Sequence, residues 1–176
     1  MTCFAYFVST GARHGDIILA ANAILLNFFF IFSYGLDGFA HASEALVGNA
    51  IGKKDTVLTT KSIFSTGKFS LILTLVYLAA FLIFDEAIIS LITNLELVQI
   101  AANYFSFWLY LIFIFGGIAF WLDGVFIGAL KNKLLRDTMI ISGLIFFLFE
   151  SMFGNLANLG LWMAFLSFFI TRSLLL

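Results

Sequence analysis

The chain has 176 residues, of which 62% are hydrophobic and only 11% are charged. Soluble domains average about 45–50% apolar and about 25% charged residues, so this composition excludes a soluble globular protein and indicates an integral membrane protein. A net charge of −1 argues against a nucleic-acid partner, and the single cysteine, Cys3, excludes an internal disulfide or a thiolate metal cluster.

Uncharged apolar runs mark the expected helices along the chain. The predicted spans are residues 1–9, 17–51, 64–84, 97–129, 139–153 and 161–176. The first is too short to cross a bilayer. The second would measure about 52 Å against a hydrocarbon core of about 30 Å, so it must tilt, bend near Gly35 and Gly38, or project into the cytoplasm. No Pro-rich, Ser-rich or charged linker divides the chain, which predicts a single transmembrane helical domain over residues 1–176, an all-α six-helix bundle with a truncated first helix.

Loop charges set the expected orientation, because positive residues gather in the loops after the second and fourth spans and acids in the loop between the third and fourth. These residues are Lys53, Lys54, Lys61, Lys131, Lys133 and Arg136 on one side and Asp85, Glu86 and Glu96 on the other. The positive-inside rule places the lysine loops in the cytoplasm. Arg172 fits a cytoplasmic C-terminus, and alternation of the spans then puts both termini of this multi-pass membrane protein in the cytoplasm.

Three titratable residues share one face of the second span. Asp37, His41 and Glu44 have the spacing i, i+4, i+7. An ionised carboxylate inside a bilayer costs roughly 2.5–3.5 kcal/mol, so such a residue is retained mainly where it faces a packed interior or a watery cavity. We predict Asp37 and Glu44 as cation-coupling candidates and His41 as a proton relay. The alternatives are that the stripe joins helices by hydrogen bonds and that Glu44 lies beyond the bilayer.

Asp123 is the second intramembrane acid and the third cation-coupling candidate. It follows the uncharged run Leu97–Leu122, and the small residues of Gly124-x-x-x-Gly128 permit close approach of another helix. If the second and fourth spans leave the membrane at Lys53 and Lys131, Glu44 lies at the same membrane depth as Asp123. If the second span instead projects inward by two turns, Asp37 lies at that depth. Two carboxylates at one height could share a proton or hold a cation, because repulsion between two nearby negative charges disfavours ionisation of both.

Sequence signatures of enzymes are missing. Gly48-x-x-x-Gly52-Lys53-Lys54 resembles a phosphate loop, but its spacer is one residue short and no Ser or Thr follows the lysine. The chain has no His-Glu-x-x-His, paired-cysteine or G-x-S-x-G motif. We therefore predict no catalytic residue and no cofactor, and the sequence leaves a metal ligand set undefined.

Several motifs, in order along the chain, resemble the multidrug and toxic compound extrusion (MATE) transporters, and the DinF-like branch is the most similar. The motifs are Gly15-Asp-Ile-Ile-Leu-Ala-Ala-Asn22, Ser33-Tyr-Gly-Leu-Asp-Gly-Phe-Ala40, Glu44-Ala-Leu-Val-Gly48, Ala50-Ile-Gly52, Leu122-Asp-Gly-Val-Phe-Ile-Gly-Ala129, Arg136-Asp-x-Met139, Gly160-Leu-Trp-x-Ala-Phe165 and Arg172. Each motif alone is short, but together they cover nearly the whole chain.

The resemblance implies one of two six-helix lobes that together export organic, often cationic, compounds against a proton or sodium gradient. This chain resembles the C-terminal lobe alone, and Asp123 resembles an aspartate implicated in cation coupling. A second acid that one branch uses in the first span is missing from residues 1–10, which puts a sodium site in doubt. The implied partners are the lipid bilayer, a small organic substrate and a separately encoded N-terminal lobe, without which the chain would be inactive. The alternative is a non-transporting membrane protein or a structural remnant of a transporter lobe.

Overall fold

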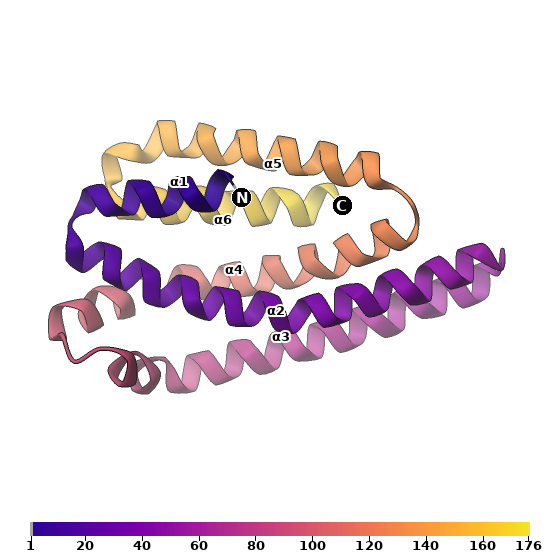
Figure 1. Ribbon diagram of the computed structural model, residues 1–176, viewed down its shortest axis with the longest axis horizontal. Helices are drawn as coiled ribbons and strands as arrows, with labels where there is room; N and C mark the ends of the chain where they lie inside the picture. Colours follow the sequence, from indigo (N-terminus) through magenta and orange to yellow (C-terminus); the bar gives the residue numbers. More distant parts are fainter. Residues whose placement is uncertain (1) are drawn as a thin grey trace.

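The computed structural model describes residues 2–176, and every regular element within them is a helix (Figure 1). The elements are α1 (Thr2–Gly11), the 3₁₀ turn η1 (Ala12–His14), α2 (Asp16–Gly52), α3 (Thr56–Ile92), α4 (Glu96–Gly128), α5 (Asn132–Phe153), the 3₁₀ turn η2 (Gly154–Leu156) and α6 (Asn158–Leu175). Five of these helices, α2 to α6, are long and apolar enough to cross a membrane. The predicted all-α membrane fold is therefore confirmed.

Helix α3 is longer than predicted. It extends by eight residues at each end beyond the predicted span 64–84, so Asp85 and Glu86 belong to the helix rather than to a loop. The connection to α4 is only Thr93–Leu95. The prediction failed because a span read from uncharged residues stops at the first charge, whereas backbone hydrogen bonding continues through charged residues. The residues between the predicted spans 139–153 and 161–176 likewise form the 3₁₀ turn η2 and the start of α6.

Helix α2 runs unbroken through Gly35 and Gly38 and measures about 55 Å at 1.5 Å per residue. Its last turns extend past the other helices together with the first turns of α3 (Figure 1). Asp55 begins α3 by accepting a hydrogen bond from the Leu58 backbone N–H at 2.8 Å, which satisfies one free donor of the first turn. Figure 1 shows that α2 changes direction near its middle and also projects beyond the other helices, so a bend and a projection are combined in this long helix.

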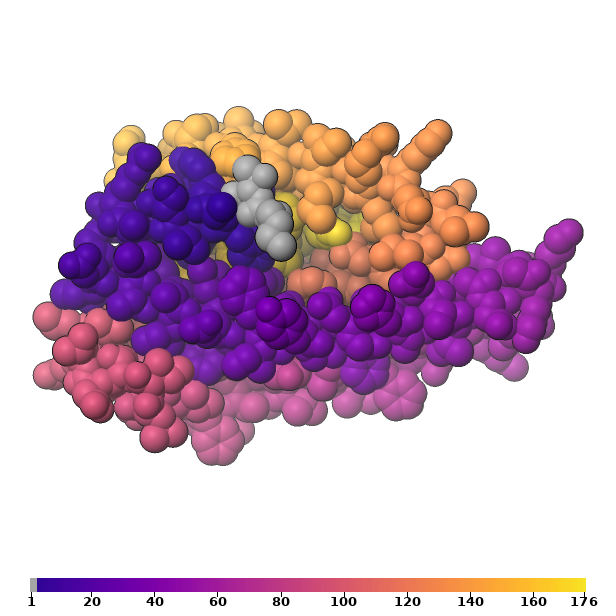
Figure 2. All heavy atoms as spheres, in the orientation of Figure 1, coloured from indigo at the N-terminus to yellow at the C-terminus, as the bar shows by residue number. Residues whose placement is uncertain are grey.

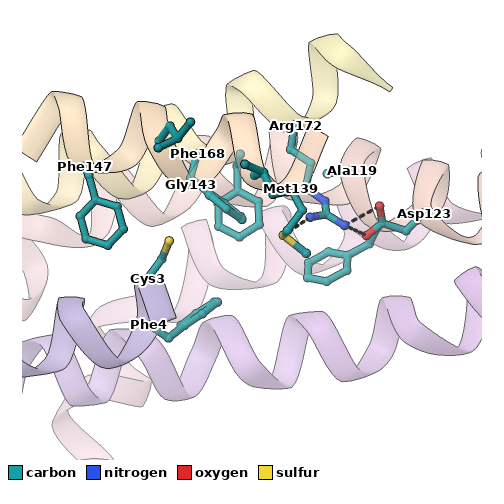
Figure 3. A pocket seen from close by; sticks show the side chains of 13 residues that line it. Cys3, Phe4, Ala119, Asp123, Met139, Gly143, Phe147, Phe168 and Arg172 are labelled. Atoms are coloured by element: carbon teal, nitrogen blue, oxygen red, sulfur yellow. Dashed lines mark hydrogen bonds and ion pairs between the residues drawn. The ribbon is translucent and has the colours of Figure 1, made fainter. Parts of the chain in front are cut away.

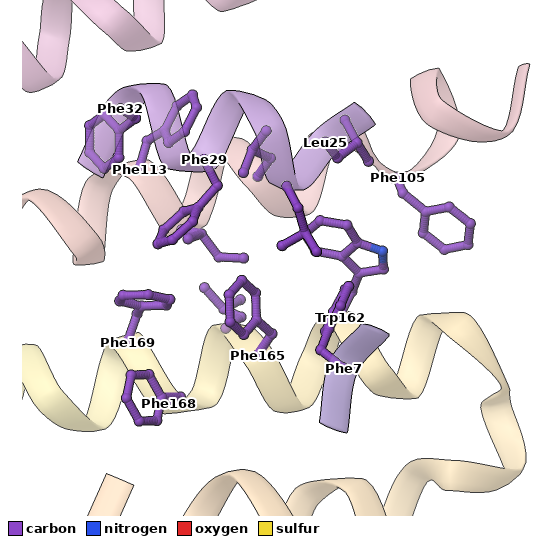
Figure 4. Close-up of a cluster of buried hydrophobic side chains, with 14 of the residues drawn as sticks. Phe7, Leu25, Phe29, Phe32, Phe105, Phe113, Trp162, Phe165, Phe168 and Phe169 are labelled. Atoms are coloured by element: carbon purple, nitrogen blue, oxygen red, sulfur yellow. The ribbon is translucent and has the colours of Figure 1, made fainter. Parts of the chain in front are cut away.

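Aromatic side chains form the core between α1, α2, α4 and α6 (Figure 4). The ring centroid of Phe165 lies 5.0 Å from that of Phe7, 5.7 Å from that of Phe29 and 5.3 Å from that of Phe169. Tilted and edge-to-face pairs at such distances each contribute about 0.5–1.5 kcal/mol beyond area burial. Helix α6 is thus central in the bundle, whereas α5 lies at its side and buries Thr138, Ser142 and Phe146.

A buried polar contact joins the opposite end of α2 to α6. Asn22 and Asn158 exchange two side-chain hydrogen bonds of 2.7 Å and 3.1 Å, and the indole N–H of Trp162 donates to Asn22 Oδ1 at 3.0 Å. Asn22 and Asn158 are almost fully buried, so each bond replaces a lost bond to water. Nearby, Gly15 has φ 97°, which favours glycine and allows the sharp turn between η1 and α2.

Candidate functional site

The contact between α2 and α4 positions the acidic residues. Gly124 and Gly128 of α4 lie directly against the backbone of α2. A Cβ atom added at Gly124 would lie 2.1 Å from the carbonyl oxygen of Ala40, and one added at Gly128 would lie 2.6 Å from that of Glu44. Only glycine allows the two backbones to come this close. The predicted role of the Gly124-x-x-x-Gly128 motif in helix approach is confirmed.

The same contact sets the relative heights of the three acids. Because the two close contacts lie four residues apart on both helices, α2 and α4 run in parallel with Ala40 level with Gly124. Asp123 is therefore about 3 Å in height from Asp37 and about 7.5 Å from Glu44 at 1.5 Å per residue. Asp37 is thus the acid level with Asp123, as predicted for a long helix that projects by two turns.

Asp123 forms an ion pair with Arg172 of α6 inside the bundle. Nη2 of Arg172 lies 2.7 Å from both carboxylate oxygens, and Nη1 donates to the sulfur of Met139 on α5. The side chains of Asp123 and Arg172 are only 19% and 9% exposed. Two opposite charges at this distance in a poorly solvated site attract strongly, which compensates for part of their lost hydration. The pair therefore connects α4 to α6 and α5.

Arg172 is the site residue that sequence reasoning missed. From the sequence, Arg172 is expected to be a positive charge near a cytoplasmic C-terminus and part of the family resemblance, whereas the structure shows that its side chain is buried. A signal was present: Arg172 is the only charged residue in the predicted span 161–176. An unaccompanied arginine in an apolar helix needs an acidic partner from another helix, and Asp123 supplies it.

The ion pair lies at one end of a half-open cavity of about 460 Å³ between α1, α4, α5 and α6. Figure 2 shows the hollow between α5 and α2, with α6 visible inside it. In the close-up, Asp123, Arg172 and Met139 stand at one end, and Cys3 and Phe147 stand at the other (Figure 3). The cavity is therefore apolar over most of its length and charged at a single end.

The other candidate residues lie on the surface of α2 rather than in the bundle interior. Asp37 is exposed, and the side chains of His41 and Glu44 are 81% and 44% exposed. His41 Nδ1 lies 3.6 Å from Glu44 Oε2. Asp37 is expected to face either the bundle interior or its cavity, and in this lobe its side chain is exposed rather than packed in the interior. The coupling roles of Asp37, Glu44 and Asp123 and the relay role of His41 stay predictions.

Comparison with known proteins identifies the family. The model of the MatE family matches residues 1–156. The chain is 33% identical over 172 residues to DNA damage-inducible protein F of Escherichia coli (strain K12), and the matched region covers 98% of this chain and 38% of that protein. No solved structure gives a significant match. The chain therefore belongs to the MatE family and is a multi-pass membrane protein that spans less than two fifths of its relative's length.

Proposed function

We propose that the chain is one lobe of a MATE-type antiporter, in which entry of a proton or sodium ion is coupled to export of organic, often cationic, compounds. The observation that carries this proposal is the buried Asp123–Arg172 pair, a charged element in an otherwise apolar bundle. Buried charges inside membrane helices are costly and are typical of ion pathways. Family membership supports the transporter class.

Coupling would act through competition between the transported cation and Arg172 for the Asp123 carboxylate. A proton or sodium ion that neutralises Asp123 weakens the attraction to Arg172, and Arg172 connects α4 to α6. Occupancy by the cation would thereby change the packing of two helices at the cavity.

The proposed lobe does not transport alone. Alternating access in secondary carriers needs one half of the molecule to move against another around a shared site, and this chain would supply one half. We expect expression of this chain in a drug-sensitive, efflux-deficient bacterium to leave the minimal inhibitory concentration of cationic dyes unchanged. Raised resistance that Asp123→Asn abolishes would contradict this requirement for a second lobe. If co-expression with a six-helix N-terminal lobe also fails to raise resistance, the non-transporting alternative is favoured.

We propose that the protein resides in the bacterial inner membrane with both termini in the cytoplasm. The lysines that follow α2 and α4 support this orientation, since the C-terminal ends of these two helices lie at the same end of the bundle (Figure 1). In a Cys3→Ser background, single cysteines at Thr56 and Asn94 should differ in labelling by an impermeant maleimide. We expect labelling from outside the cell at Asn94 alone, and labelling at Thr56 alone would reverse the orientation.

A further inference from the structure

The cavity beside the ion pair has an apolar part and one polar end. Phe4, Phe147 and Phe168 come from three different helices and line the apolar part. Asp123 and Arg172 supply the two charges in its lining, and these cancel. A volume of about 460 Å³ falls in the range of about 300–1,000 Å³ that is usual for small-molecule sites. The cavity is therefore shaped for a compound with an apolar body and one polar head.

Unused hydrogen-bonding capacity at the polar end belongs to Arg172. The guanidinium carries five N–H donors, and its Nη2 serves Asp123 while Nη1 donates to the weak acceptor sulfur of Met139. Among residues 3–176 its Nε–H has no hydrogen-bond acceptor, although the side chain is only 9% exposed. Asp123, in contrast, accepts a hydrogen bond at each of its two oxygens. The Nε–H of Arg172 is therefore the donor at the polar end that a ligand with an acceptor group could satisfy.

We propose that this cavity binds an amphipathic carboxylate, with its apolar chain between the phenylalanines and its carboxylate accepting a hydrogen bond from the Nε–H of Arg172. A hydrogen bond between a charged donor and a charged acceptor is roughly twice as strong as one between neutral groups. Asp123 competes with the ligand for the same positive charge, so neutralising Asp123 strengthens binding. The proposed site differs from the cation-coupling role of Asp123, and it does not depend on transport by the chain.

Fluorescence titration of the purified chain in a neutral maltoside detergent tests the proposal. The probe is 11-(dansylamino)undecanoic acid, and its methyl ester is the uncharged control. We expect the acid to bind roughly tenfold more tightly than the ester, as for one charge-assisted hydrogen bond. Asp123→Asn should tighten binding of the acid and leave binding of the ester unchanged.

A double variant, Asp123→Asn with Arg172→Gln, separates ligand binding from folding because it leaves no buried charge unpaired. Circular dichroism should show a folded helical protein, and we expect the preference for the acid over the ester to be lost. Lys68→Gln is the matched control, since Lys68 is an exposed cation that lines a separate groove of about 440 Å³ between α3 and α4.

Three results would overturn the proposed site. The first is equal affinity of the parent chain for acid and ester. The second is a double variant that is folded and still prefers the acid as strongly as Asp123→Asn does. The third is a loss of that preference in Lys68→Gln, which would place the probe in the groove between α3 and α4 instead.

Discussion

Replacing Gly124 by valine is expected to separate α2 from α4 and to leave little folded protein. A Cβ atom at this position would lie 2.1 Å from the carbonyl oxygen of Ala40, and backbone atoms cannot rotate away as a flexible side chain would. Overpacking of a well-packed site costs about 1–3 kcal/mol and more where the backbone itself must move. Alanine at Gly124 should already be destabilising, although alanine is favoured over glycine in a helix by about 1 kcal/mol.

Thermal unfolding of detergent-solubilised variants, followed by circular dichroism, measures this effect. Gly38→Ala is the matched control. Like Gly124, Gly38 lies inside a long helix, here α2, but an added Cβ there meets no atom within 4 Å. That variant should keep or raise the melting temperature through helix propensity alone. Equal melting temperatures for Gly124→Ala and Gly38→Ala would show that α2 and α4 do not pack closely at Gly124.

Removing the charge of Arg172 alone is expected to be more harmful than removing both charges of the ion pair. Arg172→Gln leaves the Asp123 carboxylate buried without its partner, and breaking a buried pair in this way costs about 3–5 kcal/mol. In the double variant with Asp123→Asn two neutral side chains remain, so most of that stability should return. The expected result is therefore a strong, favourable coupling energy between the two substitutions.

The free energies of unfolding of the parent, the two single variants and the double variant form a double-mutant cycle that measures this coupling. Arg136→Gln serves as the control. The side chain of Arg136 is 65% exposed and forms a surface ion pair with its neighbour Asp137, so its loss should change stability by about 0.5 kcal/mol or less. Additive effects of the two single substitutions would mean that Asp123 and Arg172 do not act as a pair.

Much of the fold was predictable from the sequence. Composition places the chain in a membrane, and within a membrane every backbone group must be bonded internally, so long apolar runs become helices. The existence of the five long helices follows from those runs, as does the close approach at Gly124 from its spacing to Gly128. Helix ends were less predictable, since the charges of Asp85 and Glu86 do not interrupt backbone hydrogen bonds.

The site was only half predictable. By itself, the sequence determined that Asp123 is a costly charge in an apolar segment. It also limited the acids that could lie at the same membrane depth to Asp37 and Glu44. The tertiary structure decided that Asp37 is level with Asp123, because the register between α2 and α4 depends on which glycine meets which backbone carbonyl. It also decided that Asp123 is paired with Arg172, 49 residues away. Helical periodicity relates residues within one helix only, and a charge pair between helices exists only once their packing brings the two side chains to 2.7 Å.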